Sequence, residues 1–351
     1  MTAQTLRAGI LRAHAARARR RVLALVLMGL GLAACVAADV ALGSTHIGLG
    51  EILQAVFAPA GADPETAIIV WSLRLPCALL AVLVGAALSL AGAEMQTVLD
   101  NPLADPFTLG VSSAASLGAA LAIVTGLHLP GVPAEWSLAA NTFFFAFASV
   151  LLLQAVTRTG RRGKQTMVLF GISMVFTFNA LVALLQYAAN PDDLQQLVFW
   201  SMGSLALSSW PKLQVLGVVL LAMLPFSLRA AARLNVLRMG EERARTLGID
   251  TGRLRFGALL RISLLAATAV AFVGTIGFVG LVGPHIARML IGEDHRYFLP
   301  ASALAGAVLM SLASIASKAI LPGVILPVGI VTAIVGVPVF LWLILRRSAQ
   351  A

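Results

Sequence analysis

The side chains with the clearest chemical potential are ionisable residues inside apolar stretches, namely Asp39, Glu94, Arg261 and Arg288. Buried carboxylates in membrane proteins often act as proton or ion relays, because a charge inside a bilayer is expensive to keep. Asp39 and Glu94 lie near the expected ends of their apolar stretches, which favours exposed or snorkelling side chains over a relay. We therefore expect the energy for any transport to come from elsewhere.

Signatures of catalysis and of metal or nucleotide binding are absent from the sequence. Residues 160–165 resemble a phosphate-binding loop only superficially, because the leading glycine spacing and the hydroxyl after the lysine are missing. The five histidines are dispersed, and no H-E-x-x-H, Cys/His cluster or G-x-S-x-G motif occurs. Cys35 and Cys77 accompany apolar runs and are expected to be packing residues. We expect no enzyme activity, metal site or bound cofactor in this chain.

The composition indicates a membrane protein. Of the 351 residues, 59% are hydrophobic and 11% are charged, whereas soluble proteins carry about 25% charged residues. The apolar residues are enough for about ten spans of ~20 residues each. A soluble enzyme, a disordered chain and a disulfide-stapled secreted domain are thereby excluded. We predict an all-α polytopic membrane protein with about ten transmembrane helices.

The expected spans follow from the apolar runs. A basic start before the first run is also typical of a signal peptide, but that run is long enough to be a retained span. The Gly-rich run 278–292 is short, so residues 256–292 fit either one long helix or two short ones. The predicted spans cover residues 22–42, 76–98, 107–127, 137–157, 165–187, 211–228, 256–277, 278–292, 298–318 and 328–345.

The charges between the spans predict the orientation. With the N-terminus inside, 21 of the 25 Lys and Arg residues fall in cytoplasmic segments, which satisfies the positive-inside rule. The net charge of +10 thus encodes topology, and no nucleic acid partner is expected. The predicted organisation is a cytoplasmic basic segment 1–21, one transmembrane domain 22–346 and a cytoplasmic tail 347–351. The expected cytoplasmic segments are 1–21, 99–106, 158–164, 229–255, 288–297 and 346–351.

Two segments outside the spans carry amphipathic patterns. In the external segment 43–75, apolar residues over 49–57 recur at helical spacing and predict a helix lying in the interface. In the cytoplasmic loop 229–255, the residues from Glu241 to Leu247 predict a short helix ended by Gly248. Such a helix either rests on anionic lipid headgroups or docks into a groove of a cytoplasmic partner. Composition alone leaves both readings open.

Several motifs resemble those of one transporter family. The chain from about residue 22 to residue 346 resembles the FecCD family, the permease subunits of ABC importers for ferric siderophores, haem and cobalamin. The matching stretches are 74–76 (RLP) with 83–88 and 91–93, 101–113 (NPLADPFTLGVSS), 199–205 (FWSMGSL), 277–288 (GFVGLVGPHIAR) and 326–333 (LPVGIVTA). Their motif residues include Asn101, Pro102, Asp105, Pro106, Gly110, Pro284, His285, Arg288, Pro327 and Gly329.

This resemblance implies a ten-helix subunit of the bacterial inner membrane that pairs with itself or with a close paralogue. Two cytoplasmic ATPase subunits would hold ATP and Mg, and a periplasmic or lipid-anchored binding protein would deliver the substrate. The implied contacts with the ATPase are Glu241, Ala244, Arg245, Leu247 and Gly248. The fifth and tenth spans would line the path, with Ser173, Thr177 and Asn179 on its wall.

On the outer face, the resemblance implies that basic residues clasp carboxylates of the binding protein. Arg74, Lys212 and Lys318 are the candidates, and interfacial snorkelling is the alternative. The sequence departs from the family pattern at Cys77, where an arginine is usual, at Ser314, where an aspartate is usual, and at Ile325, where a glutamate is usual.

The stretch 96–110 is most similar to the ferric-siderophore branch, with haem second and cobalamin third. The rival classes of function are an ion-coupled secondary transporter and an intramembrane enzyme.

Overall fold

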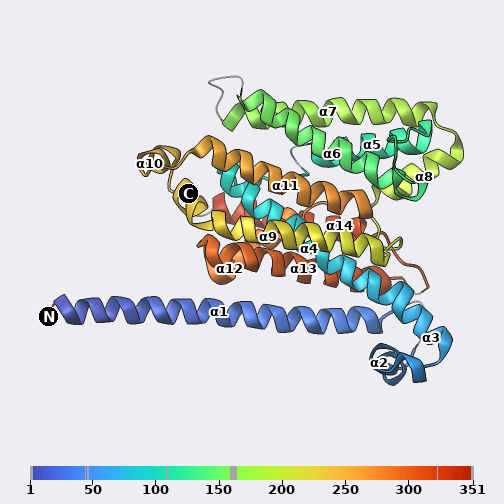
Figure 1. Cartoon of the computed structure of the whole chain (residues 1–351), viewed down its shortest axis with the longest axis horizontal. Coiled ribbons are helices and arrows are strands. Elements are labelled where there is room, and N and C mark those ends of the chain that lie inside the picture. The colour runs from blue at the N-terminus through green and yellow to red at the C-terminus, as the bar shows by residue number, and fades with distance from the viewer. Residues whose placement is uncertain are drawn as a thin grey trace.

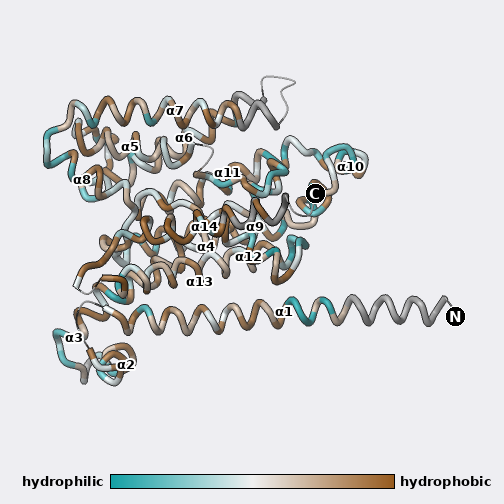
Figure 2. Tube along the Cα trace, turned by 180° about the vertical axis from the view of Figure 1, so that it is seen from behind, coloured by the Kyte–Doolittle hydropathy of each residue, from teal (hydrophilic) through white to brown (hydrophobic). Residues whose placement is uncertain are grey.

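The computed structural model describes residues 3–348, except 44, 46, 108–109, 159–163 and 322. All regular secondary structure in these ranges is helical, which confirms the predicted all-α class. Figure 2 shows hydrophobic residues along the lengths of the helices and hydrophilic residues gathered towards their ends. Two arginines of the expected basic loop 158–164, Arg161 and Arg162, and the end of the expected tail lie outside the described residues.

Ten apolar helices match the ten predicted spans in order. Seven are long and apolar enough to cross a membrane: α1 (Ala3–Ala41), α4 (Leu75–Leu99), α6 (Ala134–Arg158), α7 (Lys164–Ala188), α9 (Trp210–Arg238), α11 (Thr251–Val273) and α13 (His295–Ala319). Two are shorter, α5 (Val111–Thr125) and α12 (Val279–Ile291). The tenth, α14 (Val328–Ser348), is described with its side chains over Val328–Val339, which is also a short apolar stretch. The region 256–292 is therefore divided between two helices.

The connecting segments gather at two opposite ends of the bundle (Figure 1). One end, called the α10 end, holds α10 (Glu241–Thr246), the start of α1 and the end of the chain. The other, called the α2 end, holds α2 (Leu49–Phe57), α3 (Pro64–Ile68) and α8 (Pro191–Ser201), together with the short turns η1 (Pro59–Gly61) and η2 (Ile69–Arg74). The helix predicted over residues 49–57 is α2. The segments expected on opposite sides of the membrane thus separate in space.

Helix α4 is the centre of the molecule and packs against α9, α11, α12 and α13. Glycines bring the backbones of these helices together: Gly85 lies against Gly306 of α13, and Gly92 lies against Gly280 of α12. A Cβ atom on Gly85, Gly92 or Gly306 would overlap the neighbouring backbone, and one on Gly280 would lie 3.0 Å from the carbonyl oxygen of Leu88. In a bilayer, where the hydrophobic effect does not drive helices together, such close van der Waals contact is a main source of association.

We predict that Gly306→Ala destabilises the protein by about 1–3 kcal/mol, because the added methyl group overfills a packed contact with Gly85. Gly29→Ala in α1 is the matched control, because no atom lies within 4 Å of the position its Cβ would take. Thermal unfolding of both purified variants measures the effect. Gly306→Ala should have a lower melting temperature than the unmodified protein, and Gly29→Ala should not. Equal melting temperatures would contradict the packing described here.

Candidate functional sites

The motif stretches, which are far apart in the sequence, meet around residues 274–283, where α11 gives way to α12. The side chain of Asp105 reaches Gly280, so that a Cβ there would lie 3.1 Å from a carboxylate oxygen. A Cβ on Gly277 would likewise touch the ring of Phe107 at 3.9 Å. The loop between α4 and α5 therefore folds inward against the start of α12.

The stretches 199–205 and 326–333 join the same junction through hydrogen bonds to backbone carbonyls. The N–H of Gly329 donates to the carbonyl of Gly203 (3.1 Å), and the hydroxyl of Thr275 donates to the carbonyl of Ser201 (2.5 Å). Gly203 has a φ of +70°, and a Cβ there would overlap the carbonyl of Thr275. Only glycine fits this position without strain.

A short α12 explains why these motifs must be in contact. Thirteen residues span about 20 Å, whereas the hydrocarbon core is about 30 Å thick. The non-helical residues 274–278 consequently lie at membrane depth, where the protein itself must satisfy their backbone groups. Phe278 adopts a φ of +69°, and its side chain packs against Gly336 of α14. Together the motifs pack around the non-helical residues 274–278 that separate α11 from α12.

The remaining motif residues have local structural roles. Asn101 accepts a hydrogen bond from the N–H of Leu103 (3.0 Å), and Asp105 accepts one from the N–H of Phe107 (2.6 Å). Burial raises the pKa of Asp105 to about 6, although the bond from Phe107 opposes that shift. The prolines and Gly110, with φ of +87°, shape the same loop. Further along the chain, Pro284, His285 and Arg288 lie on α12, and Pro327 precedes α14.

The short helix predicted from Glu241 to Leu247 is present as α10, which ends at Thr246. Burial raises the pKa of Glu241, but hydrogen bonds and charges from Arg255 (2.6 Å) and Arg245 (2.7 Å) outweigh it, so the net shift is downward. Ala244 is fully buried, and Gly248 adopts the left-handed conformation expected of a residue that ends a helix. Leu247 is 66% exposed at the tip of the loop. Helix α10 and the residues after it to Gly248 are called the α10 loop below. Contacts within the subunit hold this loop in place, and it exposes the apolar side chain of Leu247.

The structure places two of the three predicted docking cations inside the subunit, at the end of α1. The Arg74 guanidinium donates to the carbonyls of Val40 (3.1 Å) and Ala41 (2.9 Å). Lys318 donates to the carbonyl of Asp39 (3.1 Å) and to its carboxylate (2.8 Å). Both cations thus satisfy carbonyls that the end of a helix leaves unpaired.

The burial of Arg74 and Lys318 limits their access to a binding protein. The residue Arg74 is 5% exposed and the side chain of Lys318 is 6% exposed, so neither reaches the surface in this conformation. Lys212 is half-buried and donates to the carbonyl of Leu207 (2.7 Å). These contacts hold α1 and the α2 end in place, a role that the sequence analysis missed.

The expectation that Asp39 and Glu94 are exposed or snorkelling is wrong. Asp39 is 0% exposed and pairs with Lys318, and Glu94 is 1% exposed and pairs with Arg261. The partners lie on α13 and α11, too far along the chain for a pattern in one span to reveal them. A carboxylate locked to a cation is poorly suited to carrying a proton or an ion.

Two of the departures from the family pattern lie side by side. Ser314 donates to the carboxylate of Asp39 (3.0 Å), and its side chain lies next to that of Cys77. The two positions where an arginine and an aspartate were expected therefore hold small neutral side chains in contact with each other. The buried acid of this region comes from α1 instead. Ile325, the third departure, is exposed.

The predicted path residues Ser173, Thr177 and Asn179 lie on the exposed side of α7. The hydroxyls of Ser173 and Thr177 donate to carbonyls one turn earlier in their own helix (3.0 and 2.9 Å), so neither needs an outside partner. Phe176 and Tyr187, at 72% and 91% exposed, extend the same surface. The described part of α7 therefore presents an uncharged, mainly apolar face with small polar groups.

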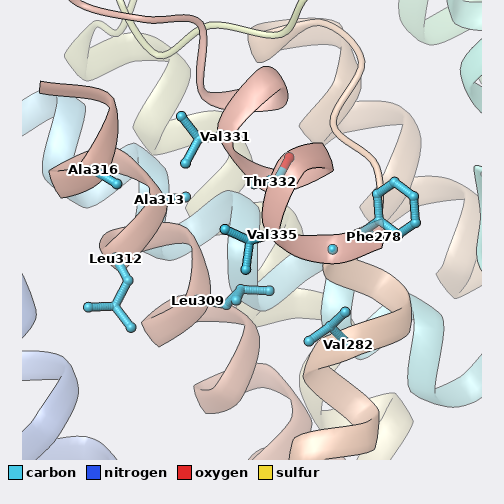
Figure 3. Close-up of a pocket in the computed structure, with 10 residues that line it drawn as sticks. Phe278, Val282, Leu309, Leu312, Ala313, Ala316, Val331, Thr332 and Val335 are labelled. Atoms are coloured by element: carbon cyan, nitrogen blue, oxygen red, sulfur yellow. The ribbon is translucent and has the colours of Figure 1, made fainter. Parts of the chain in front are cut away.

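A separate cavity of about 240 Å³ lies between α12, α13 and α14 (Figure 3). Phe278, Val282 and Val335 line it, and the hydroxyl of its one polar residue, Thr332, already donates to the carbonyl of Gly329. Sites for drug-sized ligands measure about 300–1,000 Å³. This cavity is therefore too small to be the passage for a large chelate.

Comparison with known proteins identifies the family. The model of the FecCD transport family matches residues 31–346. A hemin transport permease of Yersinia pestis is 39% identical over 80% of this chain and 84% of its own length. A vitamin B12 import permease of Vibrio cholerae is 34% identical over 92% of this chain and 93% of its own length, and a molybdate import permease of Haemophilus influenzae is 35% identical over 90% and 94%.

The fold leads to the same family. A metal-chelate type ABC transporter solved in an inward-facing conformation superposes with a TM-score of 0.80 at 32% identity, covering 92% of this chain and 98% of that one. The chain belongs to the FecCD family and is a permease subunit of an ABC importer. ATP hydrolysis in such importers belongs to separate subunits.

The ion pair at the end of α1 gives a stability prediction. Lys318→Met should destabilise the protein by about 3–5 kcal/mol, because it leaves Asp39 charged and buried without a cation. The double variant Asp39→Asn/Lys318→Met should be more stable than Lys318→Met alone, since it removes both charges. Unfolding in mixed detergent micelles measures these differences, and simple additivity of the two substitutions would contradict the pairing.

Proposed function

We propose that this chain forms, as one of two permease subunits, the path of a ferric siderophore across the bacterial inner membrane. The α10 end faces the cytoplasm, with both termini on that side, and the α2 end faces the binding protein. The observation that carries the proposal is the α10 loop, which is braced by Glu241 and presents Leu247 at its tip. Membership of the FecCD family supports the same assignment.

The α10 loop is suited to docking an ATPase subunit. Its exposed apolar tip is small enough to insert into a groove of a partner, and Arg245 and Arg253 beside it are exposed and add charge complementarity. Buried Ala244 and the Glu241–Arg255 pair connect the loop firmly to the bundle. A displacement of the loop by its partner would therefore move whole helices.

The nature of the cargo is inferred from the face of α7. Pores for oxyanions are lined by cationic side chains, whereas the described part of this face carries no charged side chain. A large chelate with an organic surface would slide along such a wall without tight binding. This supports an iron chelate over molybdate, with haem and cobalamin as the alternatives suggested by the relatives' names.

The passage is proposed to lie between two permease subunits. The cavity between α12, α13 and α14 is too small for a chelate, and the path residues of α7 lie on the outer surface of the subunit. Two copies, or one copy and a close paralogue, would bring such surfaces face to face. An ion-coupled mechanism finds no support, because Asp39 and Glu94 are both held in ion pairs.

Delivery from a binding protein at the α2 end is part of the proposal. Docking through Arg74 and Lys318 would require both cations to leave their partners on α1. Lys212, which is half-buried and donates to the carbonyl of Leu207, is the most accessible of the three.

Substitution of Leu247 tests the docking assignment. A tagged Leu247→Asp variant should lose the ATPase that co-purifies with the unmodified chain, because a carboxylate at the tip cannot enter an apolar groove. Leu207→Asp is the matched control, since Leu207 is 73% exposed at the α2 end. Mass spectrometry of the purified complexes measures the result. Retention of the ATPase by Leu247→Asp would contradict the assignment.

Uptake by cells tests the cargo. Deletion of the gene for this chain should abolish accumulation of radioactive iron from ferric siderophores, and its return on a plasmid should restore accumulation. Haem and cobalamin uptake, measured in the same strains, should be unchanged. Loss of haem or cobalamin uptake with normal siderophore uptake would assign the cargo to that alternative.

A further inference from the structure

The last two turns of α4 carry polar side chains that reach different neighbouring helices at one level of the bundle. Glu94 pairs with Arg261 of α11, and Thr97 is hydrogen-bonded to His295 of α13. Between them, Gln96 accepts a hydrogen bond from Arg288 of α12 (2.9 Å). Polar and ionisable side chains inside a membrane are energetically costly and usually have a functional role. This set of contacts is called the α4 polar collar below.

The strongest member of the collar is the ion pair between Glu94 and Arg261. The Nε of Arg261 lies 3.0 Å from both carboxylate oxygens of Glu94, and one Nη lies 2.5 Å from Oε2. The residues are 1% and 9% exposed. A buried bidentate ion pair opposes both sliding and separation of α4 and α11, because either movement would leave a buried charge without its partner.

A second contact runs from α4 to α9. The hydroxyl of Thr97 lies 2.7 Å from Nε2 of His295, whose Nδ1 lies 2.7 Å from the side-chain oxygen of Asn235 on α9. The side chain of Asn235 also donates to Asp294 (2.9 Å). The imidazole therefore links α4 to α9 through two polar contacts.

These two contacts join α4 to the two helices that flank α10. Helix α10 connects α9 to α11, and each of those helices is joined to the end of α4, one through Asn235 and His295 and the other through Arg261. Directly after α4 comes the loop to α5, in which the described residues Asp105 and Phe107 lie against the α11–α12 junction. The collar is thus the mechanical link between the docking loop and the inward-folded loop.

We propose that the α4 polar collar couples ATP hydrolysis to transport, with Glu94 and Arg261 as positioning residues that transmit a displacement of α10 to α4 and the loop 100–110. The proposal rests on the proposed function of α10 as the docking site of an ATPase. Apolar contacts between helices permit small slides, whereas a buried bidentate pair keeps α11 and α4 moving together.

The test uses the complete importer in proteoliposomes and measures both ATP hydrolysis and substrate transported. For Glu94→Gln, hydrolysis should stay within about twofold of the unmodified importer, while substrate moved per ATP should fall about tenfold. The charge-exchanged variant Glu94→Arg/Arg261→Glu should recover much of that ratio. Thr97→Val, which keeps the side-chain volume, should lower the ratio in the same direction.

Thr125→Val is the matched control for Thr97→Val, because the Thr125 hydroxyl is exposed on α5 and donates to the carbonyl of Leu121 in its own helix, outside both the collar and the α10 loop. It should leave the ratio unchanged. An unchanged ratio in Glu94→Gln and Thr97→Val would overturn the proposal, as would equal losses of hydrolysis and transport in both variants. Where Glu94→Gln fails to fold, Thr97→Val and the charge-exchanged variant decide the matter. Failure of the proposed function is separate, because the unmodified importer would then show no ATP-driven transport.

Discussion

Close glycine packing around α4 is the constraint on which the rest of the structure depends. Gly85 and Gly92 let α13 and α12 approach α4 until the backbones touch, and this contact fixes the broken helix between α11 and α12. The non-helical backbone of that break is then covered by the loop after α4 and by the start of α14. A bilayer offers no water to such backbone, so its polar groups are bonded or packed within the protein.

Most of the buried charged side chains around this core have partners on other helices or at helix ends. Two buried acids are paired with cations from other helices, Asp39 near the α2 end and Glu94 near the α10 end. Arg74 and Lys318, which were expected on the surface, instead close the end of α1. The exposed charge lies mainly on connecting segments, among them the α10 loop, where the proposed partner would be met.

Much of the fold could be predicted from the sequence, because hydropathy reports directly on which segments span a bilayer. Helices occupy all ten predicted spans, and seven of these helices are long and apolar enough to cross a membrane. Helices α2 and α10 also lie where the pattern predicted helices. The pairings of Glu94 and Asp39 could not be predicted, since their partners lie more than 160 residues away and depend on which helices adjoin. The neighbouring positions of Cys77 and Ser314 became apparent only when α4 and α13 were placed together.

The central claim is that a partner's ATP hydrolysis drives this permease. Uptake into proteoliposomes that contain the permease pair, the ATPase and the binding protein tests it most directly. We predict that uptake requires ATP and the binding protein and persists when ionophores collapse all ion gradients. Uptake by the permease alone that stops when the gradients collapse would contradict this account.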